Sequence, residues 1–414
     1  MNIARLVRAC KGLEWRWPTQ HDIIIYDSYS ERHLRPFFLS DNYQVFDTTL
    51  QRINFWVLLR SLKFGRLCLI HYFLAYVQTT HARLVISTID NSPTLYQIKP
   101  VLPNVHVVVI QNGRRDTIAK FPNESFVNEL SKLNLNRKCQ VDYFFTFGMT
   151  EVEQFRELIE CTFVPHGSLK NNFLKRKPDP KNRTLTFVSS LPRNCSLIET
   201  DSNAIMGYSK FEPILLRTYF EAEFLTAEWL QQFAIANNLG FQILGKRSHE
   251  FEEQEILFRR RVTGDWKFIY CNYEYESYET LLNSDYIAGV DSTLLYEMFG
   301  RGKRTAFFTI RRAILGLETL HCPNFGFPAI KEDCGPMWTN IPTATNYLNV
   351  AKTVTMTSDA EWSKIVDTYA PLVMNWDFGN GLLAETLSSL DFPVERDESS
   401  RIQRAVSTYL KAAD

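Results

Sequence analysis

Short apolar runs alternate with stretches of helical periodicity along most of the chain. In the first part, the apolar runs predict buried strands at residues 22–27, 83–90, 104–110, 143–147 and 162–164. The intervening patterns predict a strand, loop and helix over residues 45–62, and helices at 67–78 and from about residue 151. Strands that are apolar throughout and alternate with helices are typical of a parallel sheet with both faces covered.

The pattern is interrupted at residues 175–183, where charged residues and two prolines show no periodicity. Such a segment is typical of a linker between domains. Beyond it the alternation resumes, and strands are expected at residues 184–190, 240–244, 267–271, 286–290 and 304–310. Helices are expected at residues 219–238, 277–283, 292–301 and 362–376.

Two successive strand–helix alternations predict an α/β protein made of two Rossmann-like lobes that face a central cleft. We expect an N-terminal lobe over residues 1–174, the linker over 175–183, and a C-terminal lobe over 184–357. Helices over residues 358–395 and an amphipathic tail over 396–414 would complete the chain. The length of 414 residues agrees with two domains, because a single core rarely grows that large.

Composition excludes several classes of protein. Apolar residues make up 45% of the chain, which is enough for two cores and argues against disorder. Lys plus Arg and Asp plus Glu both number 46, so no overall positive field attracts nucleic acid. The eight cysteines show no CxxC spacing, which argues against a zinc site or a disulfide framework and favours free cytoplasmic thiols.

The sequence predicts neither a membrane span nor a signal peptide. The most apolar run, residues 67–77, is far shorter than the roughly 20 residues that a spanning helix needs. Arg5, Arg8 and Lys11 interrupt the apolar region that a signal peptide would require. The predicted location is therefore the cytoplasm.

The tail allows two interpretations. Ile402, Val406 and Leu410 share one helical face, with Arg401 and Arg404 elsewhere. Basic amphipathic helices of this kind lie in a membrane interface, which would place the protein peripherally at the inner face of the cytoplasmic membrane. The alternative is a helix that packs on the body of the protein.

The clearest candidate site begins where the predicted strand 286–290 ends. Asp291 is followed by Ser292 and Thr293, and a helix then starts. Either hydroxyl residue is a natural N-cap, which would leave N–H donors at the helix start for the oxygens of a phosphate.

The same helix carries three more candidate residues. Glu297 lies one turn further on the face of Thr293, where its carboxylate could accept the hydroxyls of a ribose. Arg301 and Lys303 end the element with positive charge. The alternative is an ordinary capped helix whose basic residues complement the helix dipole.

Two further segments follow predicted strands and could hold the same ligand. Gly167, Ser168 and Asn171 come just before the linker, and their alternative is a plain turn. Gly245 and Lys246 follow the strand at 240–244, an edge that faces the ligand crevice in open α/β sheets, and their alternative is a surface turn.

The N-terminal lobe offers a second set of polar residues at strand ends. Asp90 and Asn91 follow one strand, and Gln111, Asn112 and Arg114 follow the next. We expect this set to hold an acceptor molecule. Asp90 is the candidate general base, because a reacting hydroxyl needs a proton acceptor within hydrogen-bond reach. The alternative is that Asp90 caps the helix that follows.

Several familiar motifs are absent. The sequence has no GxGxxG, Walker A, HExxH or GxSxG motif, which argues against dinucleotide enzymes, P-loop kinases, zincins and α/β-hydrolases. It also lacks the Asp-x-Asp pair that holds a divalent ion on a sugar diphosphate. We therefore expect neither a metal ion nor a cofactor.

Taken together, several segments resemble a group of bacterial proteins of surface-carbohydrate biosynthesis (capsule and lipopolysaccharide) that are akin to GT-B glycosyltransferases. The resemblance lies in residues 110–114, 167–172, 291–297, 301–303, 307–308, 325–328 and 335–338. The matches run in order from about residue 110 to 340. Where the family pattern has a glycine in the Asp-Ser-Thr-Leu element, this chain has Leu295.

The resemblance implies a GT-B glycosyltransferase that binds a nucleotide-sugar in its C-terminal lobe and a glycan acceptor, free or lipid-linked, in its N-terminal lobe. The product would be a surface polysaccharide such as capsule or O-antigen. The group also resembles transferases of CMP-activated acidic sugars such as Kdo, although the His-Pro motif of some CMP-sugar enzymes is absent. The alternatives are a nucleotide-sugar epimerase of the same fold and a non-catalytic protein of carbohydrate assembly.

The mechanistic hypothesis places the donor phosphate on the helix start at Ser292 and Thr293. Arg301, Lys303 or Lys246 would then offset the charge that develops on the leaving group. If the reaction inverts the anomeric centre, Asp90 deprotonates the acceptor. In a retaining double displacement, a carboxylate attacks the sugar instead. The sequence leaves both routes open.

Overall fold

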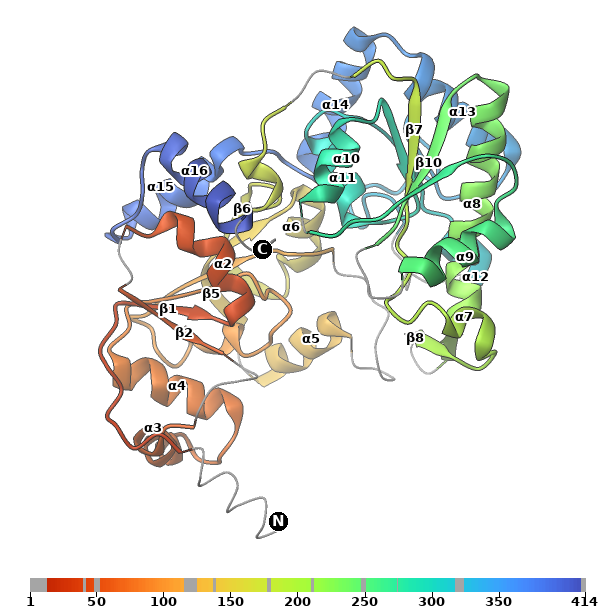
Figure 1. Ribbon diagram of the computed structural model, residues 1–414. Helices are drawn as coiled ribbons and strands as arrows, with labels where there is room; N and C mark the ends of the chain where they lie inside the picture. Colours follow the sequence, from red (N-terminus) through yellow and green to blue (C-terminus); the bar gives the residue numbers. More distant parts are fainter. Residues whose placement is uncertain are drawn as a thin grey trace.

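The computed structural model describes residues 13–39, 42–47, 53–114, 125–136, 139–176, 180–209, 212–246, 251–273, 275–316 and 324–410. These residues form two α/β lobes, each built on a six-stranded parallel sheet. Figure 1 shows the N-terminal lobe in red to yellow beside the C-terminal lobe in green to cyan. The predicted fold class, two Rossmann-like lobes of GT-B-like architecture, is confirmed.

The N-terminal sheet has the strand order β2-β1-β3-β4-β5-β6. Its strands are β1 (Ile23–Tyr26), β2 (Tyr43–Phe46), β3 (Leu84–Ser87), β4 (His106–Ile110), β5 (Cys139–Thr146) and β6 (Ile159–Pro165). Its helices are α2 (Ser28–Leu34), α3 (Phe55–Ser61), α4 (Leu69–Thr80), α5 (Phe126–Asn136) and α6 (Met149–Phe155). The central strands β1 and β3 are buried along their whole length, which explains why they read as unbroken apolar runs.

The C-terminal sheet has the strand order β11-β10-β7-β12-β13-β14. Its strands are β7 (Thr184–Val188), β10 (Gly240–Leu244), β11 (Lys267–Ile269), β12 (Tyr286–Gly289), β13 (Arg304–Phe308) and β14 (Trp338–Thr339). Its helices are α8 (Leu216–Ala236), α9 (Phe251–Arg261), α10 (Glu276–Leu282), α11 (Thr293–Gly300), α12 (Arg311–Leu315) and α13 (Ala344–Met356). A short helix α7 (Leu197–Thr200) and an antiparallel hairpin of β8 (Ile205–Ser209) and β9 (Glu212–Leu215) precede α8; the sequence pattern did not predict them.

The last three helices are α14 (Asp359–Val373), α15 (Gly381–Ser389) and α16 (Glu398–Leu410). Helix α14 begins three residues before the predicted start, because Ser358 and Glu361 form a capping box there. The helix also ends three residues before the predicted end at 376, where the chain turns toward the N-terminal lobe. Figure 1 shows α15 and α16, in blue, lying against that lobe.

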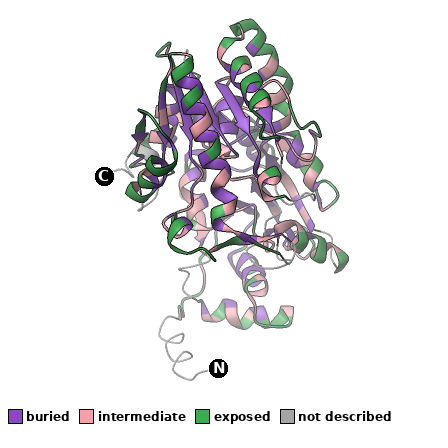
Figure 2. Ribbon diagram, turned by 90° about the vertical axis from the view of Figure 1, so that its right-hand side faces the viewer, coloured by how far each residue is buried: buried purple, intermediate pink, exposed green. Residues whose placement is uncertain are grey.

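The hydrophobic core of the N-terminal lobe explains why helices α15 and α16 return to this lobe. Buried residues of the N-terminal sheet, among them Ile25 and Ile86, share one cluster with Leu383 and Leu387 of α15 and Ala405 of α16. Figure 2 shows the buried positions concentrated on the sheets and on the inner faces of the helices. The predicted tail over residues 396–414 therefore contains a helix that packs on the body of the protein; residues 411–414 lie outside the described part.

The last turn of α14 and the segment that follows it cross from one lobe to the other in close contact with three glycines. A Cβ on Gly148 would lie 2.4 Å from the Leu372 carbonyl oxygen, and one on Gly300 would lie 2.5 Å from that of Met374. A Cβ on Gly167 would lie 2.0 Å from the Asn375 carbonyl oxygen. The crossing chain therefore touches the backbones of both lobes, and only glycine leaves room for it at these positions.

This packing predicts that Gly300→Ala destabilises the protein. The added methyl group would force the crossing chain away from α11, at a cost of about 2 kcal/mol in the free energy of unfolding. Urea titrations followed by circular dichroism measure the change. Gly240→Ala is the matched control, since the nearest atoms to a Cβ there are 3.9 Å away. The control should unfold at the wild-type urea concentration or above it. Equal effects of the two variants would contradict the close approach.

The same junction contains His166, which predicts acid sensitivity. Its ring is fully buried beside Phe145, and burial lowers its pKa from 6.5 to about 4. Between pH 6.5 and 4 the unfolded chain takes up a proton that the folded chain cannot, so stability falls as the pH falls through this window. From pH 8 to pH 5 this effect amounts to roughly 2 kcal/mol.

Urea titrations of the wild type and of His166→Gln at both pH values isolate the contribution of the histidine. The variant lacks the titrating group, so its stability should fall less over this range than that of the wild type, by the same roughly 2 kcal/mol. Parallel pH profiles for the two proteins would show that His166 does not titrate in this way.

Candidate functional site

A cavity of about 440 Å³ opens at the carboxyl edge of the C-terminal sheet. The winding of this sheet reverses between β7 and β12, and ligands of open α/β sheets bind at such a point. Loops after β7, β10, β11 and β12 line the cavity, together with residues of α8, α10, α11 and α12 and one side chain from the N-terminal lobe. The main lining residues are Arg114, Ser189, Ser190, Tyr219, Gly245, Lys246, Ser277, Asp291, Ser292, Thr293, Leu294 and Arg311.

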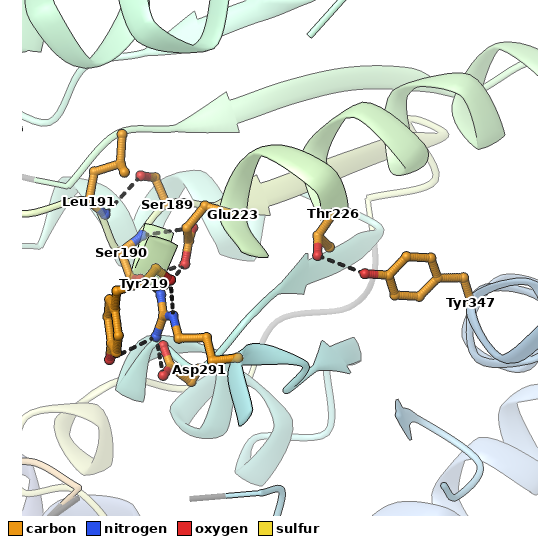
Figure 3. Close-up of polar contacts among 9 residues, drawn as sticks. Ser189, Ser190, Leu191, Tyr219, Glu223, Thr226, Asp291 and Tyr347 are labelled. Carbon is orange, nitrogen blue, oxygen red and sulfur yellow. Dashed lines mark hydrogen bonds and ion pairs between the residues drawn. The ribbon is translucent and has the colours of Figure 1, made fainter. Parts of the chain in front are cut away.

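One wall of the cavity is built around the buried Arg311, whose partners Ser190, Tyr219, Glu223 and Asp291 are labelled in Figure 3. Arg311 Nη2 donates to Glu223 Oε1 at 2.6 Å and to Ser190 Oγ at 2.7 Å. Its Nη1 donates to Asp291 Oδ2 and, at 3.2 Å, to the Tyr219 hydroxyl, and its Nε donates to the Tyr219 carbonyl oxygen. All five N–H groups of the guanidinium therefore have acceptors within the protein.

Burial and the neighbouring charged groups shift the pKa values of Glu223 and Arg311 in this wall. Burial raises the pKa of Glu223, against the opposing effect of Arg311. Burial alone would lower the pKa of Arg311, but Asp291, Tyr219 and Glu223 together raise it above its usual value. Arg311 thus stays charged and saturated with partners. It fixes the positions of Ser190 and Asp291, which face the cavity, rather than offering free donors to a ligand.

Two other cations face the cavity with fewer protein partners. Lys246 is exposed at its edge, on a loop held by paired hydrogen bonds between its own backbone and the Gln254 side chain. Desolvation lowers the pKa of Lys246, while nearby Glu223 and Asp291 raise it. Arg114 reaches across from the N-terminal lobe, its guanidinium 4.3 Å from the centre of the Tyr296 ring.

Helix α11 begins at the cavity without a side-chain cap. Ser292 is the N-cap residue and has the extended backbone of that position, yet its hydroxyl makes no hydrogen bond to the helix. The first N–H groups of a helix have no partner within the helix and carry its partial positive charge. The geometry therefore suits an anionic group beside Ser292 and Thr293.

Of the residues proposed from sequence, the structure brings five together at this cavity. They are Arg114, Gly245, Lys246, Ser292 and Thr293. Arg247, which follows Lys246, lies outside the described residues. That these five contact a ligand stays a prediction, but they meet on one concave surface.

Gly167, Ser168 and Asn171 lie instead at the junction between the lobes, together with Glu297. Ser168 Oγ donates to Glu297 Oε1 at 2.5 Å, and the Tyr278 hydroxyl donates to Glu297 Oε2 at 2.7 Å. The Asn171 amide donates to the Glu297 carbonyl oxygen at 3.0 Å. Burial raises the pKa of Glu297. Both carboxylate oxygens are occupied by the protein, so in this conformation Glu297 does not offer them to a ribose.

Arg301 and Lys303 lie beyond the far end of α11. The eight residues of this helix span about 12 Å, so its basic end is well separated from the cavity at its start. The Arg301 guanidinium donates to the Lys175 carbonyl oxygen, and burial lowers its pKa to about 10. Both side chains are buried, which argues against the role of offsetting leaving-group charge that the sequence suggested for them.

The residues proposed for the acceptor hold the loop that carries Arg114. Asp90 is fully buried, and its Oδ1 accepts the Asn112 N–H at 3.1 Å. Gln111 is also buried and accepts the Phe147 N–H at 2.8 Å. Asn91 is exposed beside them. With Asp90 enclosed, no acceptor hydroxyl reaches it in this conformation.

Sequence reasoning missed Arg311, Glu223, Ser190 and Tyr219. Lys246 was selected because ligands bind at the carboxyl ends of strands in open α/β sheets. The same rule could have selected Ser190 and Arg311, which also come at or just beyond the ends of predicted strands. Glu223 and Tyr219 gave no such signal. They lie in the predicted helix region, and only the fold shows that they face Arg311.

The described residues contain no group of three or more His, Cys, Asp or Glu side chains arranged to hold a metal ion. Within the same part of the chain, no helix combines the length and the apolarity that crossing a bilayer requires.

Two doubly wound lobes facing each other, with a polar cavity at the carboxyl edge of the second sheet, define a GT-B-like α/β protein. A family model described as "putative O-antigen biosynthesis protein" matches residues 108–391, more than half of the chain. The chain belongs to this family. A comparison with curated proteins gives no match.

Several solved structures resemble the chain at low identity. The wall teichoic acid polymerase TagF is 11% identical, with 90% of this chain and 89% of that chain covered and a TM-score of 0.46. UDP-GlcNAc 2-epimerase from Neisseria meningitidis is 9% identical, with 89% and 99% covered and a TM-score of 0.47. Sucrose-phosphate synthase from Thermosynechococcus elongatus is 11% identical, with 90% and 98% covered and a TM-score of 0.47.

The arginine-centred wall predicts that Glu223→Gln destabilises the protein. The neutral amide leaves the Arg311 charge buried with less compensation, and breaking such a pair costs about 3–5 kcal/mol. Glu221→Gln is the matched control on the same helix, because its partner Arg261 lies 3.5 Å away at the surface. The control should change the free energy of unfolding by less than about 1 kcal/mol. Urea titration distinguishes the two, and a mild effect of Glu223→Gln would refute a tight buried pair.

Proposed function

We propose that the protein is a glycosyltransferase of bacterial surface-polysaccharide synthesis. It would take a sugar from a nucleotide-sugar bound in the C-terminal cavity and pass it to a glycan acceptor held in the cleft beside the N-terminal lobe. The family supports the polysaccharide context, and the GT-B-like fold supports the division of labour between the lobes.

The observation that carries the proposal is the start of α11 at the cavity. Uncapped N–H groups at Ser292 and Thr293 would bind the phosphate oxygens, as helix starts do for anions elsewhere. Lys246 from the loop after β10 and Arg114 from the opposite lobe would add positive charge on the cavity side. Donors fixed in advance around a departing phosphate stabilise the charge that develops in the transition state.

On the N-terminal side of the cavity, the proposal assigns the main role to Arg114 and to the loop that carries it. The hydrogen bonds of Asp90 and Gln111 fix this loop, so these residues position Arg114 rather than meet the acceptor directly. We infer that Arg114 contacts the donor phosphate or the transferred sugar at the boundary between the lobes. This assigns Asp90 a positioning role in place of the general base expected from sequence.

The donor class follows from the resemblance seen in the sequence. CMP-activated acidic sugars such as Kdo are the donors that this resemblance favours, and the expected acceptor is a surface polysaccharide or a lipid-linked glycan. A screen of CMP, UDP, GDP and dTDP by thermal shift tests the nucleotide directly, because a ligand that binds only the folded state raises the melting temperature.

The site predicts different nucleotide affinities for two variants at Ser292 that have nearly the same shape and differ in charge. Ser292→Asp keeps a good N-cap but places a negative charge where the phosphate would sit, so affinity for the nucleotide selected in the screen should fall at least about tenfold. Ser292→Asn has the same shape and the same capping ability without the charge, so it is the matched control, and the nucleotide should bind it at least about tenfold more tightly than it binds Ser292→Asp. Isothermal titration calorimetry measures both affinities.

Equal affinities of the two Ser292 variants would move the nucleotide to another site. A wild-type protein that binds none of the four nucleotides would overturn the proposed donor class. If a purified nucleotide-sugar were converted to an isomer in the absence of any acceptor, the chain would be an epimerase instead of a transferase.

A further inference from the structure

The N-terminal lobe carries several exposed large apolar side chains that lie close together in the chain. Six large side chains on α3 and the segments around it are each between 37 and 61% exposed. We call this set the apolar surface; it consists of Trp15, Trp17, Trp56, Leu59, Leu62 and Leu67. Large exposed apolar patches mark sites of interaction with proteins or membranes.

The apolar surface is a fixed platform. The Trp15 ring stacks on Phe55 at 4.6 Å, and the rings of Trp17 and Trp56 lie 5.8 Å apart. The Trp56 indole donates to the Trp15 carbonyl oxygen at 2.9 Å. Asn54 caps α3 and also donates to the Arg16 carbonyl oxygen at 2.7 Å, which ties the two segments together. The exposed rings are therefore held in place before any partner arrives.

An apolar cavity of about 370 Å³ adjoins this surface between α3 and α4. Ile53, Leu67 and Leu69 line it and are at the same time exposed to solvent. Leu58 and Phe46 extend the lining inward. The cavity thus provides a recess for a short length of hydrocarbon chain beside the exposed side chains.

The charges among these apolar residues are mostly positive. Arg16, Arg60, Lys63 and Arg66 lie in residues 13–17 and 53–69, whereas the acidic residues are Glu14 in these two segments and Asp47 in the lining of the cavity. The excess is local, because the whole chain has equal numbers of basic and acidic residues. Arg60 stands over the Trp17 ring at 4.8 Å, so positive charge and aromatic surface are interleaved.

We propose that the apolar surface docks the protein onto an anionic phospholipid bilayer. Tryptophan prefers the boundary between headgroups and hydrocarbon, and the leucines would reach the acyl region. The basic side chains would stay at the level of the anionic headgroups. A second copy of the chain fits this surface less well, because a two-fold contact would bring the same basic groups against each other.

This surface is separate from the predicted tail contact and from the donor cavity. Helix α16 packs on the N-terminal lobe through the buried Ala405 and through Arg404, whose guanidinium donates to the Phe38 carbonyl oxygen at 2.9 Å, so it is already engaged with the protein. The proposal also does not depend on which reaction the cavity performs. Its test therefore needs no substrate.

The experiment is flotation of the full chain with vesicles of phosphatidylcholine alone and of phosphatidylcholine mixed with phosphatidylglycerol. The wild type should float with the mixed vesicles. Lys63→Gln combined with Arg66→Gln should weaken binding to the mixed vesicles about 25-fold, since each basic residue at an anionic surface contributes about fivefold. Lys352→Gln combined with Lys364→Gln, at exposed positions of the helices α13 and α14, should bind as the wild type does.

A second pair of variants tests the apolar contact. Leu59→Asp combined with Leu62→Asp should abolish flotation while circular dichroism shows an intact fold. Leu135→Asp combined with Ile235→Asp alters residues that are 84 and 64% exposed outside the apolar surface, and this control should float normally. Brominated acyl chains should quench wild-type tryptophan fluorescence, because three of the eight tryptophans belong to the surface.

Three outcomes would overturn the proposal. In the first, the wild type fails to float with the mixed vesicles. In the second, the Leu59 and Leu62 double variant floats as well as the wild type. In the third, light scattering shows that the wild type is a dimer that does not bind vesicles and that the double variant is a monomer, which would make this surface a self-association interface.

Discussion

The structure depends on one crossing of the chain between the lobes. Where α14 ends and the chain leads on to α15, the backbone lies close to Gly148 and Gly167 of the N-terminal lobe and to Gly300 of α11. The Asn375 N–H donates to the Phe147 carbonyl oxygen, and its side chain donates to that of Pro165, so the crossing is also hydrogen-bonded to the N-terminal lobe. Two lobes with separate cores are thereby joined into one molecule, with its last helices completing the core of the first lobe.

Helix α11 connects this crossing to the cavity. Its first residues form the cavity wall at Ser292, its middle presents Glu297 to Ser168 of the other lobe, and its last residue, Gly300, meets the crossing chain. Arg114 enters the cavity from the N-terminal lobe, so a change in the angle between the lobes would move it relative to Ser292. The cavity wall is therefore completed by both lobes.

Sequence patterns predicted the parts of this arrangement that depend on local periodicity. Fully buried strands read as apolar runs, and the rule that ligands bind at carboxyl strand ends led to Lys246, Ser292 and Thr293. The same reasoning gave no sign that Ser168 and Tyr278 hold the Glu297 carboxylate, because these partners are distant in sequence or lie on another helix. Nothing local distinguishes a carboxylate that awaits a ligand from one that two hydroxyl groups already hold.

Burial explains the remaining differences between expectation and structure. Asp90 ends an apolar strand, which suggested an exposed base, but its neighbours enclose it and use it to hold a backbone N–H. Arg311 shows the converse case, since it follows a predicted strand as Lys246 does and yet its five donors are all used to organise one wall of the cavity. Because a buried charge is tolerated only with nearly complete pairing, such residues tend to shape a site rather than contact its ligand. The groups left for a ligand are those with spare donors at the cavity surface: the start of α11, Lys246 and Arg114.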